Sequence, residues 1–369
     1  MVVISFDALA NRFLDRDTLP NFRRMIAEGV RAPARPEFPS KTFPNHYSMA
    51  TGLTPGQHGI VLNKFYDPSR REIFSKAVVT DGTWFGGEPI WVSAEKQGIR
   101  TAAYFWTGTE GAIDGIRPTY YHLFDATVPD STKIVELMGW LRRPQGERPH
   151  LVMIYSPVVD VPGHKVGPDG RDTFLGVREA DRILGTLRDS LSKLSSLRID
   201  LIVVSDHGLS HVPLDHDIDL DPHLPKNGAI VDNEHATFAL WQDPSGPRLN
   251  IDSIAAEYAK LPHTRVFSHG NFPAEWHAEH NPRFGDIFLL AEPGWEYETS
   301  VPHALPTIGE HGFDPATPDM MGTFIAVGPD FRAGVTLPTR ENRTLHDLLV
   351  RLLRLNTPFT TDVTDFGLR

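Results

Sequence analysis

The chain has 369 residues, of which 40% are hydrophobic and 10% aromatic, a composition typical of a folded globular protein. Its formal net charge of −11 argues against binding to a nucleic-acid backbone. The absence of cysteine excludes disulfides, thiolate metal sites and cysteine nucleophiles.

Neither a membrane span nor a leader peptide is expected from the sequence. No apolar run approaches the ~20 residues that a membrane span requires. The first residues, MVVISFDALA, do not look like a leader. We therefore expect a cytoplasmic protein, or a periplasmic or secreted one whose leader has been removed. The sequence carries no signal of oligomeric state.

Short apolar runs predict buried strands, and the spacing of apolar residues between them predicts helices. A first helix is expected over 18–30 and a longer one over 172–194. The expected strands lie at 2–6, 101–106, 150–155, 200–204, 286–291 and 323–327. Strands that are apolar throughout and alternate with helices are typical of an α/β fold with a mainly parallel central sheet and helices on both faces.

No linker rich in proline, glycine or serine divides the chain, so we expect one domain over 1–369. The stretch 211–310 is rich in histidine, proline and aspartate and looks more irregular than the rest. We expect it to form a smaller inserted lobe, a cap over one end of the sheet.

Three of the predicted strands are followed by aspartates, Asp7, Asp160 and Asp206. Because ligands bind outside the carboxyl ends of strands in open α/β sheets, we expect these carboxylates to converge. Converging carboxylates repel each other unless one is protonated or a cation lies between them. His164 follows Asp160 by four residues and His207 adjoins Asp206. Mixed nitrogen and oxygen ligands favour zinc over magnesium or calcium.

Thr42 lies in FPSKTFPNHYSMATGL, where Pro44 and the residues after it predict the start of a helix. One interpretation is that Thr42 is the N-cap of this helix. The other is that Thr42 is a nucleophile. The two roles are compatible, because a helix N-terminus also stabilises negative charge.

The stretch SKTFPNHYSMATGLTPGQHGIVLNKFYDP resembles the nucleotide pyrophosphatase/phosphodiesterases of the alkaline phosphatase superfamily. The resemblance covers most of the chain and includes ISFDAL, GGEPIWV, DVPGHKVGP, VVSDHG and GEHGFDP in the family's order. Together these blocks are specific, although SDHG alone is shared with the wider superfamily. The resemblance implies an alkaline phosphatase-like fold and a site with two zinc ions.

The resemblance also implies roles for particular residues. It implies one zinc on Asp160, His164 and His311, the other on Asp7, Asp206 and His207, and a nucleophile between them, Thr42. His311 rests on the resemblance alone, since spacing does not distinguish it from His303 or His269. Asn63 matches the family's side-chain amide that hydrogen-bonds a non-bridging phosphate oxygen.

Aromatic residues near these motifs bear on the substrate. Phe43 and Tyr155 match positions that enclose the base in nucleotide-cleaving relatives, and Phe74 is a looser match. The alternative is that these rings pack the core. A neutral amide at Asn63 favours a diester, because a monoester carries more negative charge. We interpret Lys41 as a solvated or supporting residue rather than a phosphate clamp.

We therefore expect a zinc-dependent phosphodiesterase or nucleotide pyrophosphatase. It would cleave small nucleotide or phosphodiester substrates through a covalent threonine intermediate and release a nucleoside 5′-monophosphate. The enzymatic alternatives are a phosphonate or phosphomonoester hydrolase and a lipid-headgroup phosphodiesterase of the same superfamily. A nucleotide-sensing binding protein is the non-enzymatic alternative, and the complete set of ligand positions argues against it.

Overall fold

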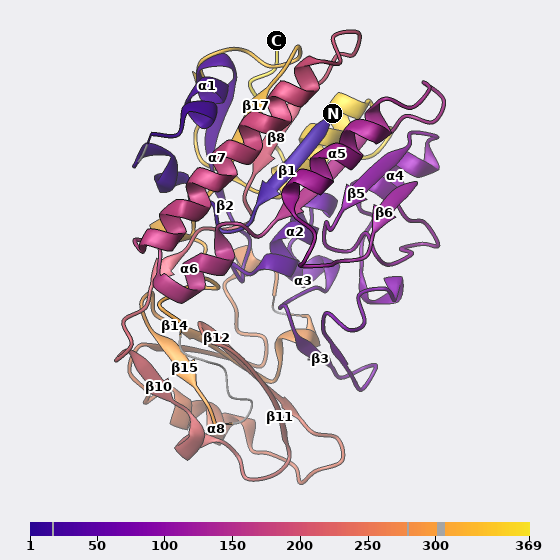
Figure 1. Ribbon diagram of the computed structural model, residues 1–369. Helices are drawn as coiled ribbons and strands as arrows, with labels where there is room; N and C mark the ends of the chain where they lie inside the picture. The colour runs from indigo at the N-terminus through magenta and orange to yellow at the C-terminus, as the bar shows by residue number, and fades with distance from the viewer. Residues whose placement is uncertain (17, 279, 301–306) are drawn as a thin grey trace.

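A nine-stranded sheet forms the centre of the computed structural model, which describes the chain except for residues 17, 279 and 301–306 (Figure 1). Its strands are, in order, β18 (Val335–Thr336), β2 (Val30–Arg35), β17 (Gly322–Val327), β8 (Leu201–Val204), β1 (Val2–Phe6), β7 (Leu151–Ser156), β5 (Thr101–Tyr104) and β6 (Tyr120–His122), with β19 (Arg340–Glu341) beside β2. The strands from β8 to β6 are parallel, whereas β17 is antiparallel to both neighbours. The predicted α/β fold with a mainly parallel sheet is confirmed.

Helices cover both faces of this sheet, as predicted. On one face, α1, α5 and α7 pack over Val2, Ile4 and Phe6 of β1, and on the other, α2, α4 and α9 belong to the cluster around Val3. This alternation follows from the period of two in a strand. The α-helices of the described residues are α1 (Pro20–Glu28), α2 (Thr42–Thr51), α3 (Pro55–His58), α4 (Ile90–Lys96), α5 (Asp130–Leu141), α6 (Asp160–Val166), α7 (Arg171–Ser192), α8 (Ile251–Tyr258) and α9 (Thr344–Leu353).

The described residues of the stretch 211–310, which we call the lobe, contain a separate sheet. Its four antiparallel strands are, in order, β11 (Ala229–Glu234), β12 (Thr237–Gln242), β14 (Ile287–Ala291) and β13 (Thr264–Ser268). The expectation of an irregular region was therefore wrong, and the strand expected at 286–291 belongs to this sheet. At the base of the lobe, β9 (Ser210–His211) pairs with β16 (Gly309–Glu310).

The lobe packs against the central-sheet part through aromatic side chains. The ring of Phe38 stacks on Trp276 of the lobe with centroids 3.7 Å apart, and Phe288 meets Phe38 edge-on at 5.6 Å. These rings belong to the hydrophobic cluster that also contains Val3 of the central sheet. The arrow of β1 points toward the lobe (Figure 1). Residues that follow β1 and its parallel neighbours therefore lie at the edge nearest the lobe.

Short elements complete the described structure. Two further strand pairs are β3 (Phe65–Asp67) with β4 (Glu72–Phe74), and β10 (Asp217–Asp219) with β15 (Glu296–Glu298). Single turns of 3-10 helix occur at Asn11–Asp15, Gly82–Trp84, Asp221–His223, Ala274–Trp276, Pro282–Phe284 and Pro318–Met320. Among the described helices, none combines the length and the apolar character needed to cross a membrane.

Candidate active site

The three predicted aspartates converge at the lobe-facing edge of the central sheet. Asp7 follows β1, Asp206 lies just past β8, and Asp160 begins α6 after β7. Since β8, β1 and β7 are parallel neighbours, their carboxyl ends lie side by side. The register of the sheet therefore brings together carboxylates that are far apart in the sequence.

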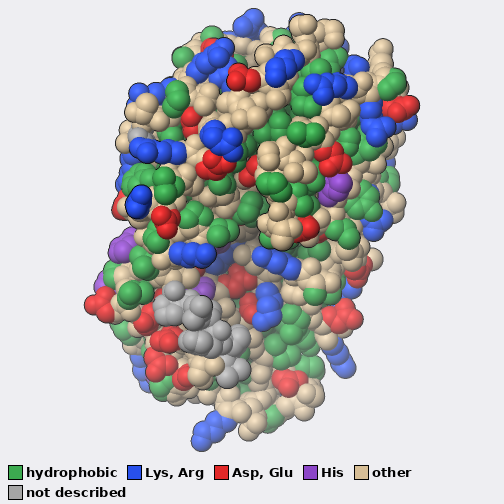
Figure 2. Space-filling view, in the orientation of Figure 1, with side chains coloured by type: hydrophobic (Ala, Val, Ile, Leu, Met, Phe, Trp, Pro, Cys, Tyr) green, Lys and Arg blue, Asp and Glu red, His purple; other side chains and the backbone are tan. Residues whose placement is uncertain are grey.

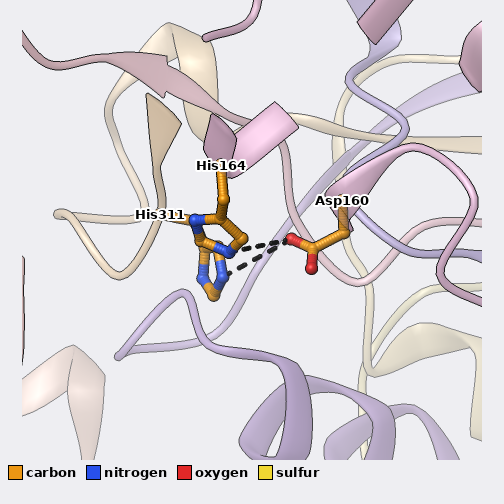
Figure 3. Close-up of side chains that lie close together, drawn as sticks. All are labelled: Asp160, His164 and His311. Atoms are coloured by element: carbon orange, nitrogen blue, oxygen red, sulfur yellow. Dashed lines mark ion pairs between the residues drawn. The ribbon is translucent and has the colours of Figure 1, made fainter. Parts of the chain in front are cut away.

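The first cluster of potential ligands is Asp160, His164 and His311 (Figure 3). Asp160 and His164 are four residues apart on α6, which places them on one face of the helix. The Nε2 atom of His164 lies 3.2 Å from Asp160 Oδ1, and the Nε2 atom of His311 lies 3.8 Å from the same oxygen. His311 reaches this point from the end of β16, after the chain has passed through the lobe.

The second cluster is Asp7, Asp206 and His207, and all three side chains are buried. The Nε2 atom of His207 lies 3.1 Å from Asp206 Oδ2 and 3.6 Å from Asp7 Oδ1. The rings of His207 and His311 stack with centroids 3.8 Å apart, so the two clusters are neighbours. The structure thus brings together all six predicted metal ligands. His269, which spacing alone did not exclude, instead pairs with Asp252, and His303 lies outside the described residues.

Backbone carbonyls orient the three histidines. Nδ1 of His164 lies 2.8 Å from Gly309 O, Nδ1 of His207 lies 3.0 Å from Gly208 O, and Nδ1 of His311 lies 3.0 Å from Ser40 O. Although burial alone would lower it, the charges of Asp160 and Glu310 raise the pKa of His164 to about 9, so a cation there would replace a proton on Nε2. A carbonyl only accepts hydrogen bonds, so each Nδ1 carries a proton and, with a metal bound, each Nε2 would offer its lone pair. This is the usual tautomer of a metal-ligating histidine.

The aspartates present unsatisfied oxygens to the same space. Asp7 Oδ1, Asp160 Oδ1 and Asp206 Oδ2 are buried without a hydrogen-bond partner among the described residues. These are the oxygens that lie nearest the histidine Nε2 atoms. A buried carboxylate oxygen without a partner is costly. The cost is removed if the oxygen binds a cation.

The shifted pKa values of the carboxylates in the second cluster also favour a bound cation. Burial, together with the charges of Asp206 and Asp160, raises the pKa of Asp7 well above its usual value. Burial opposes the ionisation of Asp206 as well, but the neighbouring His207 and His46 hold the pKa of Asp206 below its usual range. The chain alone therefore favours ionisation of Asp206 but not of Asp7. A divalent cation would favour the charged form of both.

Thr42 is the first residue of α2, and its hydroxyl lies beside the second cluster. The Oγ1 atom of Thr42 is 3.3 Å from His207 Nε2. The N-cap of α2 is Lys41, and neither a Lys41 nor a Thr42 side-chain cap is present. The interpretation of Thr42 as a capping residue was therefore wrong. Its hydroxyl points to the clusters at a helix N-terminus, where negative charge is stabilised.

The side-chain NH₂ group of Asn63 is available on the wall of the cavity that Thr42 also lines. Its Oδ1 atom accepts a hydrogen bond of 2.9 Å from the backbone N–H of Phe43, which leaves the NH₂ group available. Asn63 and Thr42 both line one cavity of about 410 Å³. The N–H of Phe43 is occupied by this bond and so does not point at a ligand.

Aromatic side chains form much of the wall of this cavity. Phe43 and Tyr155 line it, as predicted, together with Phe105 and Phe124, which no sequence motif singled out. Phe74 does not reach the cavity, because it is fully buried behind Phe43, with ring centroids 6.1 Å apart. Figure 2 shows the surface hollowed between the central-sheet part and the lobe, with charged and histidine side chains around the hollow.

Tyr155 has a second contact that the sequence did not predict. Its hydroxyl donates a hydrogen bond of 2.6 Å to Asp7 Oδ2, the oxygen that does not face His207. Burial and the charge of Asp7 raise the pKa of Tyr155 well above its usual value, so the hydroxyl remains a donor. Tyr155 thus orients a potential metal ligand while its ring lines the cavity.

A third group of potential ligands, His235, Glu296 and Glu310, lies near the first cluster. It differs from the other two because Lys41 supplies a cation from the chain, with Nζ 3.2 Å from Glu310 Oε1. We therefore assign no metal to this group. Lys41 is 3% exposed, so of its two interpretations the solvated one was wrong, whereas the supporting role stays a prediction.

His46 supports the second cluster from inside α2. It is fully buried, and its Nδ1 atom lies 2.9 Å from Thr42 O and 3.3 Å from Asp206 Oδ2, while Nε2 lies 2.8 Å from Ser5 Oγ. His46 therefore contacts both Thr42 and a potential metal ligand, Asp206. No sequence spacing pointed to this residue, since the contact joins α2 to the loop after β8.

Comparison with known proteins gives relatives along most of the chain. A model of the type I phosphodiesterase / nucleotide pyrophosphatase family matches residues 1–314. An uncharacterised pyrophosphatase/phosphodiesterase of Schizosaccharomyces pombe is 32% identical over 374 residues, which cover 96% of this chain and 77% of the yeast protein. Human ectonucleotide pyrophosphatase/phosphodiesterase family member 1 is 32% identical over 87% of this chain, which spans 36% of the human protein.

Solved structures agree with this fold. Human ectonucleotide pyrophosphatase/phosphodiesterase 5 superposes with a TM-score of 0.91 and 28% identity, over 97% of this chain and 96% of that chain. An inactive threonine-to-alanine variant of the murine protein, in complex with AMP, superposes with a TM-score of 0.90 and 28% identity, over 100% of this chain and 96% of that chain. The similarity therefore includes both the central sheet and the lobe.

Replacing His46 should weaken divalent-metal binding. His46→Ala removes the side chain that contacts Asp206 Oδ2, and loss of such an outer contact typically lowers metal affinity roughly 10- to 100-fold. The affinity is measured by competition with a chromophoric zinc chelator. His58→Ala is the matched control, because His58 is equally buried but contacts Ser48 instead of either cluster. Equal zinc affinity in His46→Ala and His58→Ala would contradict the role given to His46.

Proposed function

Because the chain belongs to the type I phosphodiesterase/nucleotide pyrophosphatase family, we propose that it hydrolyses phosphodiester or pyrophosphate bonds of nucleotides and releases a nucleoside 5′-monophosphate. The observation that carries this proposal is the position of Thr42. Its hydroxyl lies at the N-terminus of α2, beside two clusters of aspartate and histidine and at the wall of an aromatic cavity. The family in which this site is found supports hydrolysis over simple binding.

Zinc is the cation that the ligands suit best. Each cluster combines carboxylate oxygens with imidazole nitrogen, a donor set typical of zinc. Two ligand atoms at about 2.0–2.1 Å from a tetrahedral zinc lie roughly 3.3 Å from each other. The nearest ligand pairs, at 3.1 and 3.2 Å, are close to this separation. The partnerless oxygens of Asp7, Asp160 and Asp206 fit the same role.

Two bound zinc ions would neutralise the three carboxylates and leave a net charge of about +1. They would also lower the pKa of the Thr42 hydroxyl and stabilise negative charge on the phosphate. The protein supplies the rest. Backbone carbonyls orient the three histidines with Nε2 toward the clusters, and the N-terminus of α2 favours negative charge at Thr42. A threonine hydroxyl at neutral pH is otherwise a weak nucleophile.

The proposed reaction has two displacements at phosphorus. Thr42 Oγ1 bonds to phosphorus as the bond from phosphorus to the leaving oxygen breaks, and the proton released by Thr42 passes through solvent to that oxygen. Water then attacks phosphorus from the same side as the departed group, the bond to Thr42 breaks, and one proton of that water passes to Thr42 Oγ1. Two inversions give net retention. The free NH₂ group of Asn63 would donate to a non-bridging oxygen as its charge grows.

The charges around Thr42 favour a diester over a monoester. Asn63 is a neutral donor, and the ammonium of Lys41 is turned away from the cavity toward Glu310 and the carbonyl of Glu234. Neither residue adds the positive charge that a doubly charged monoester would need. Lys76 does line the cavity, but so does Glu110, and their formal charges cancel. The four aromatic rings of the cavity wall provide flat surfaces against which a base can stack.

Relatives with named substrates or ligands support a nucleotide. The murine structural relative was solved with AMP in an inactive threonine-to-alanine variant. A relative from Xenopus laevis is named bis(5′-adenosyl)-triphosphatase and is 29% identical over 96% of this chain and 77% of that protein. These are properties of the relatives, and we propose the same class of substrate here.

The reaction is tested by comparing two chromogenic esters. We expect p-nitrophenyl thymidine 5′-monophosphate, a diester, to be hydrolysed far faster than the monoester p-nitrophenyl phosphate. Dialysis against a chelator should abolish the activity and Zn²⁺ should restore it, because both clusters would lose their cations. Initial rates of p-nitrophenolate release give the ratio of kcat/KM values. A preference for the monoester would instead favour a phosphomonoesterase.

Replacing Thr42 tests the nucleophile. Thr42→Ala should lower kcat by roughly 10³-fold or more, because it removes the attacking oxygen, while leaving both clusters intact. Zinc content, measured by elemental analysis, should remain that of the wild type. Thr42→Ser should keep part of the activity, and Thr51→Ala, at the other end of α2, should keep nearly all. An active Thr42→Ala enzyme would exclude a covalent threonine intermediate.

The aromatic wall is tested at Phe124, which lines the cavity and is 44% exposed, so its removal should not disturb folding. Phe124→Ala should raise KM for the thymidine ester about tenfold, since stacking on a base is worth roughly 1–3 kcal/mol. The rate with bis(p-nitrophenyl) phosphate, which has no base, should change much less. Phe359→Ala, at an exposed ring lining another cavity, is the control. Equal effects on both substrates would mean that Phe124 does not contact the base.

A further inference from the structure

One lobe residue holds the two segments that carry Thr42 and Asn63. Glu234 is the last residue of β11 in the lobe sheet. Its carboxylate accepts hydrogen bonds from two consecutive backbone amides, with Oε1 2.7 Å from Lys64 N and Oε2 3.4 Å from Asn63 N. A side chain of the lobe thus fixes the backbone on which the Asn63 amide is carried.

The backbone of Glu234 reaches the other segment. Its carbonyl oxygen accepts a hydrogen bond of 2.7 Å from Lys41 Nζ, and Lys41 immediately precedes Thr42. The same ammonium pairs with Glu310, whose Oε1 also accepts a 2.8 Å hydrogen bond from the N–H of His311. Lys41 is therefore tied at once to the lobe sheet and to the residue before a potential metal ligand.

A direct bond between the two segments completes the arrangement. The N–H of Phe43, next to Thr42, donates to Asn63 Oδ1 and so sets the direction of the Asn63 amide. Glu234 thus contacts both segments that this bond joins, one at Asn63 and the other at Lys41. It does not line the cavity, so it cannot contact a substrate there.

We propose that Glu234 is a positioning residue for phosphoryl transfer, which fixes the amide of Asn63 against the turn that carries Thr42. This inference rests on the proposed function. An amide that stabilises transition-state charge must lie about 2.7–3.1 Å from the phosphate oxygen. A displacement of about 1 Å can cost roughly 10²-fold in rate. The two hydrogen bonds that Glu234 accepts from the backbone N–H groups of Asn63 and Lys64 restrict such a displacement.

The experiment measures kcat and KM with p-nitrophenyl thymidine 5′-monophosphate. Glu234→Ala should lower kcat roughly 10- to 100-fold, because Asn63 loses its support, while KM changes by less than about threefold, because the aromatic wall is unaltered. Glu234→Gln keeps the shape of the side chain and one carbonyl acceptor, so it should fold as the wild type does and recover part of the loss. Thermal unfolding of each variant is recorded in parallel.

A double-mutant cycle with Asn63→Ala distinguishes positioning from a general structural effect. If Glu234 acts through Asn63, Glu234→Ala combined with Asn63→Ala should be no slower than Asn63→Ala alone. The same comparison is made with Glu234→Gln, which protects the test against misfolding of the alanine variant. Losses in kcat that multiply in both double variants would overturn the proposal.

Asp232→Asn is the matched control for a lobe residue that contacts the same segment. Asp232 lies two residues before Glu234 on β11 and pairs with the ammonium of Lys64 at 2.6 Å, but it does not bond the backbone of Asn63. Its kcat should stay within about threefold of the wild type. A loss equal to that of Glu234→Ala would overturn the proposal. An inactive wild type would refute the proposed function. An active wild type whose kcat is unchanged by both Glu234 substitutions would refute only this inference.

Discussion

Repulsion among three converging carboxylates, two of them buried, is the constraint on which the rest of the site depends. The order β8–β1–β7 places Asp206, Asp7 and Asp160 at the lobe-facing edge of the sheet, where Asp7 and Asp206 are buried and Asp160 is partly exposed. The chain relieves the repulsion only in part, because histidines favour the charged form of Asp206 while burial and its neighbours oppose ionisation of Asp7. A pair of divalent cations would relieve the remainder. The histidine tautomers and the partnerless oxygens are consistent with this solution.

The sequence predicted those parts of the site that depend on a single local rule. Asp7, Asp160 and Asp206 could be found because parallel strands end at the same edge, and His164 because it is four residues from Asp160. His311 could be found only by resemblance, since the chain passes through the whole lobe before returning to the site. Such a contact leaves no periodic signal in the sequence.

Other predictions failed where tertiary packing decides the outcome. Phe74 was expected at the substrate, but it packs inward behind Phe43, against the rings of Phe65 and Trp84. Phe124 reaches the cavity wall, and Glu234 reaches the backbone of Asn63 and Lys64, through contacts between segments far apart in the sequence, which no local pattern reveals. The lobe looked irregular because its strands are short, partly polar and joined by long loops rich in proline and histidine. Most of the central fold was therefore predictable, whereas the support of the site was not.

The lobe is part of the site and not only its cover. It supplies Glu310, which pairs with Lys41. It also supplies Glu234, which accepts hydrogen bonds from the backbone of Asn63 and from the ammonium of Lys41. Because these carboxylates neutralise Lys41 inside the protein, its charge is not available to a substrate. With two divalent cations bound and Thr42 still protonated, the charge of the clusters would be about +1 despite a chain charge of −11, and Lys76 and Glu110 on the cavity wall carry opposite formal charges. Distant surface charges are screened beyond about 8 Å at physiological salt. The near charges therefore decide selectivity, and a net charge of about +1 matches the single negative charge of a diester.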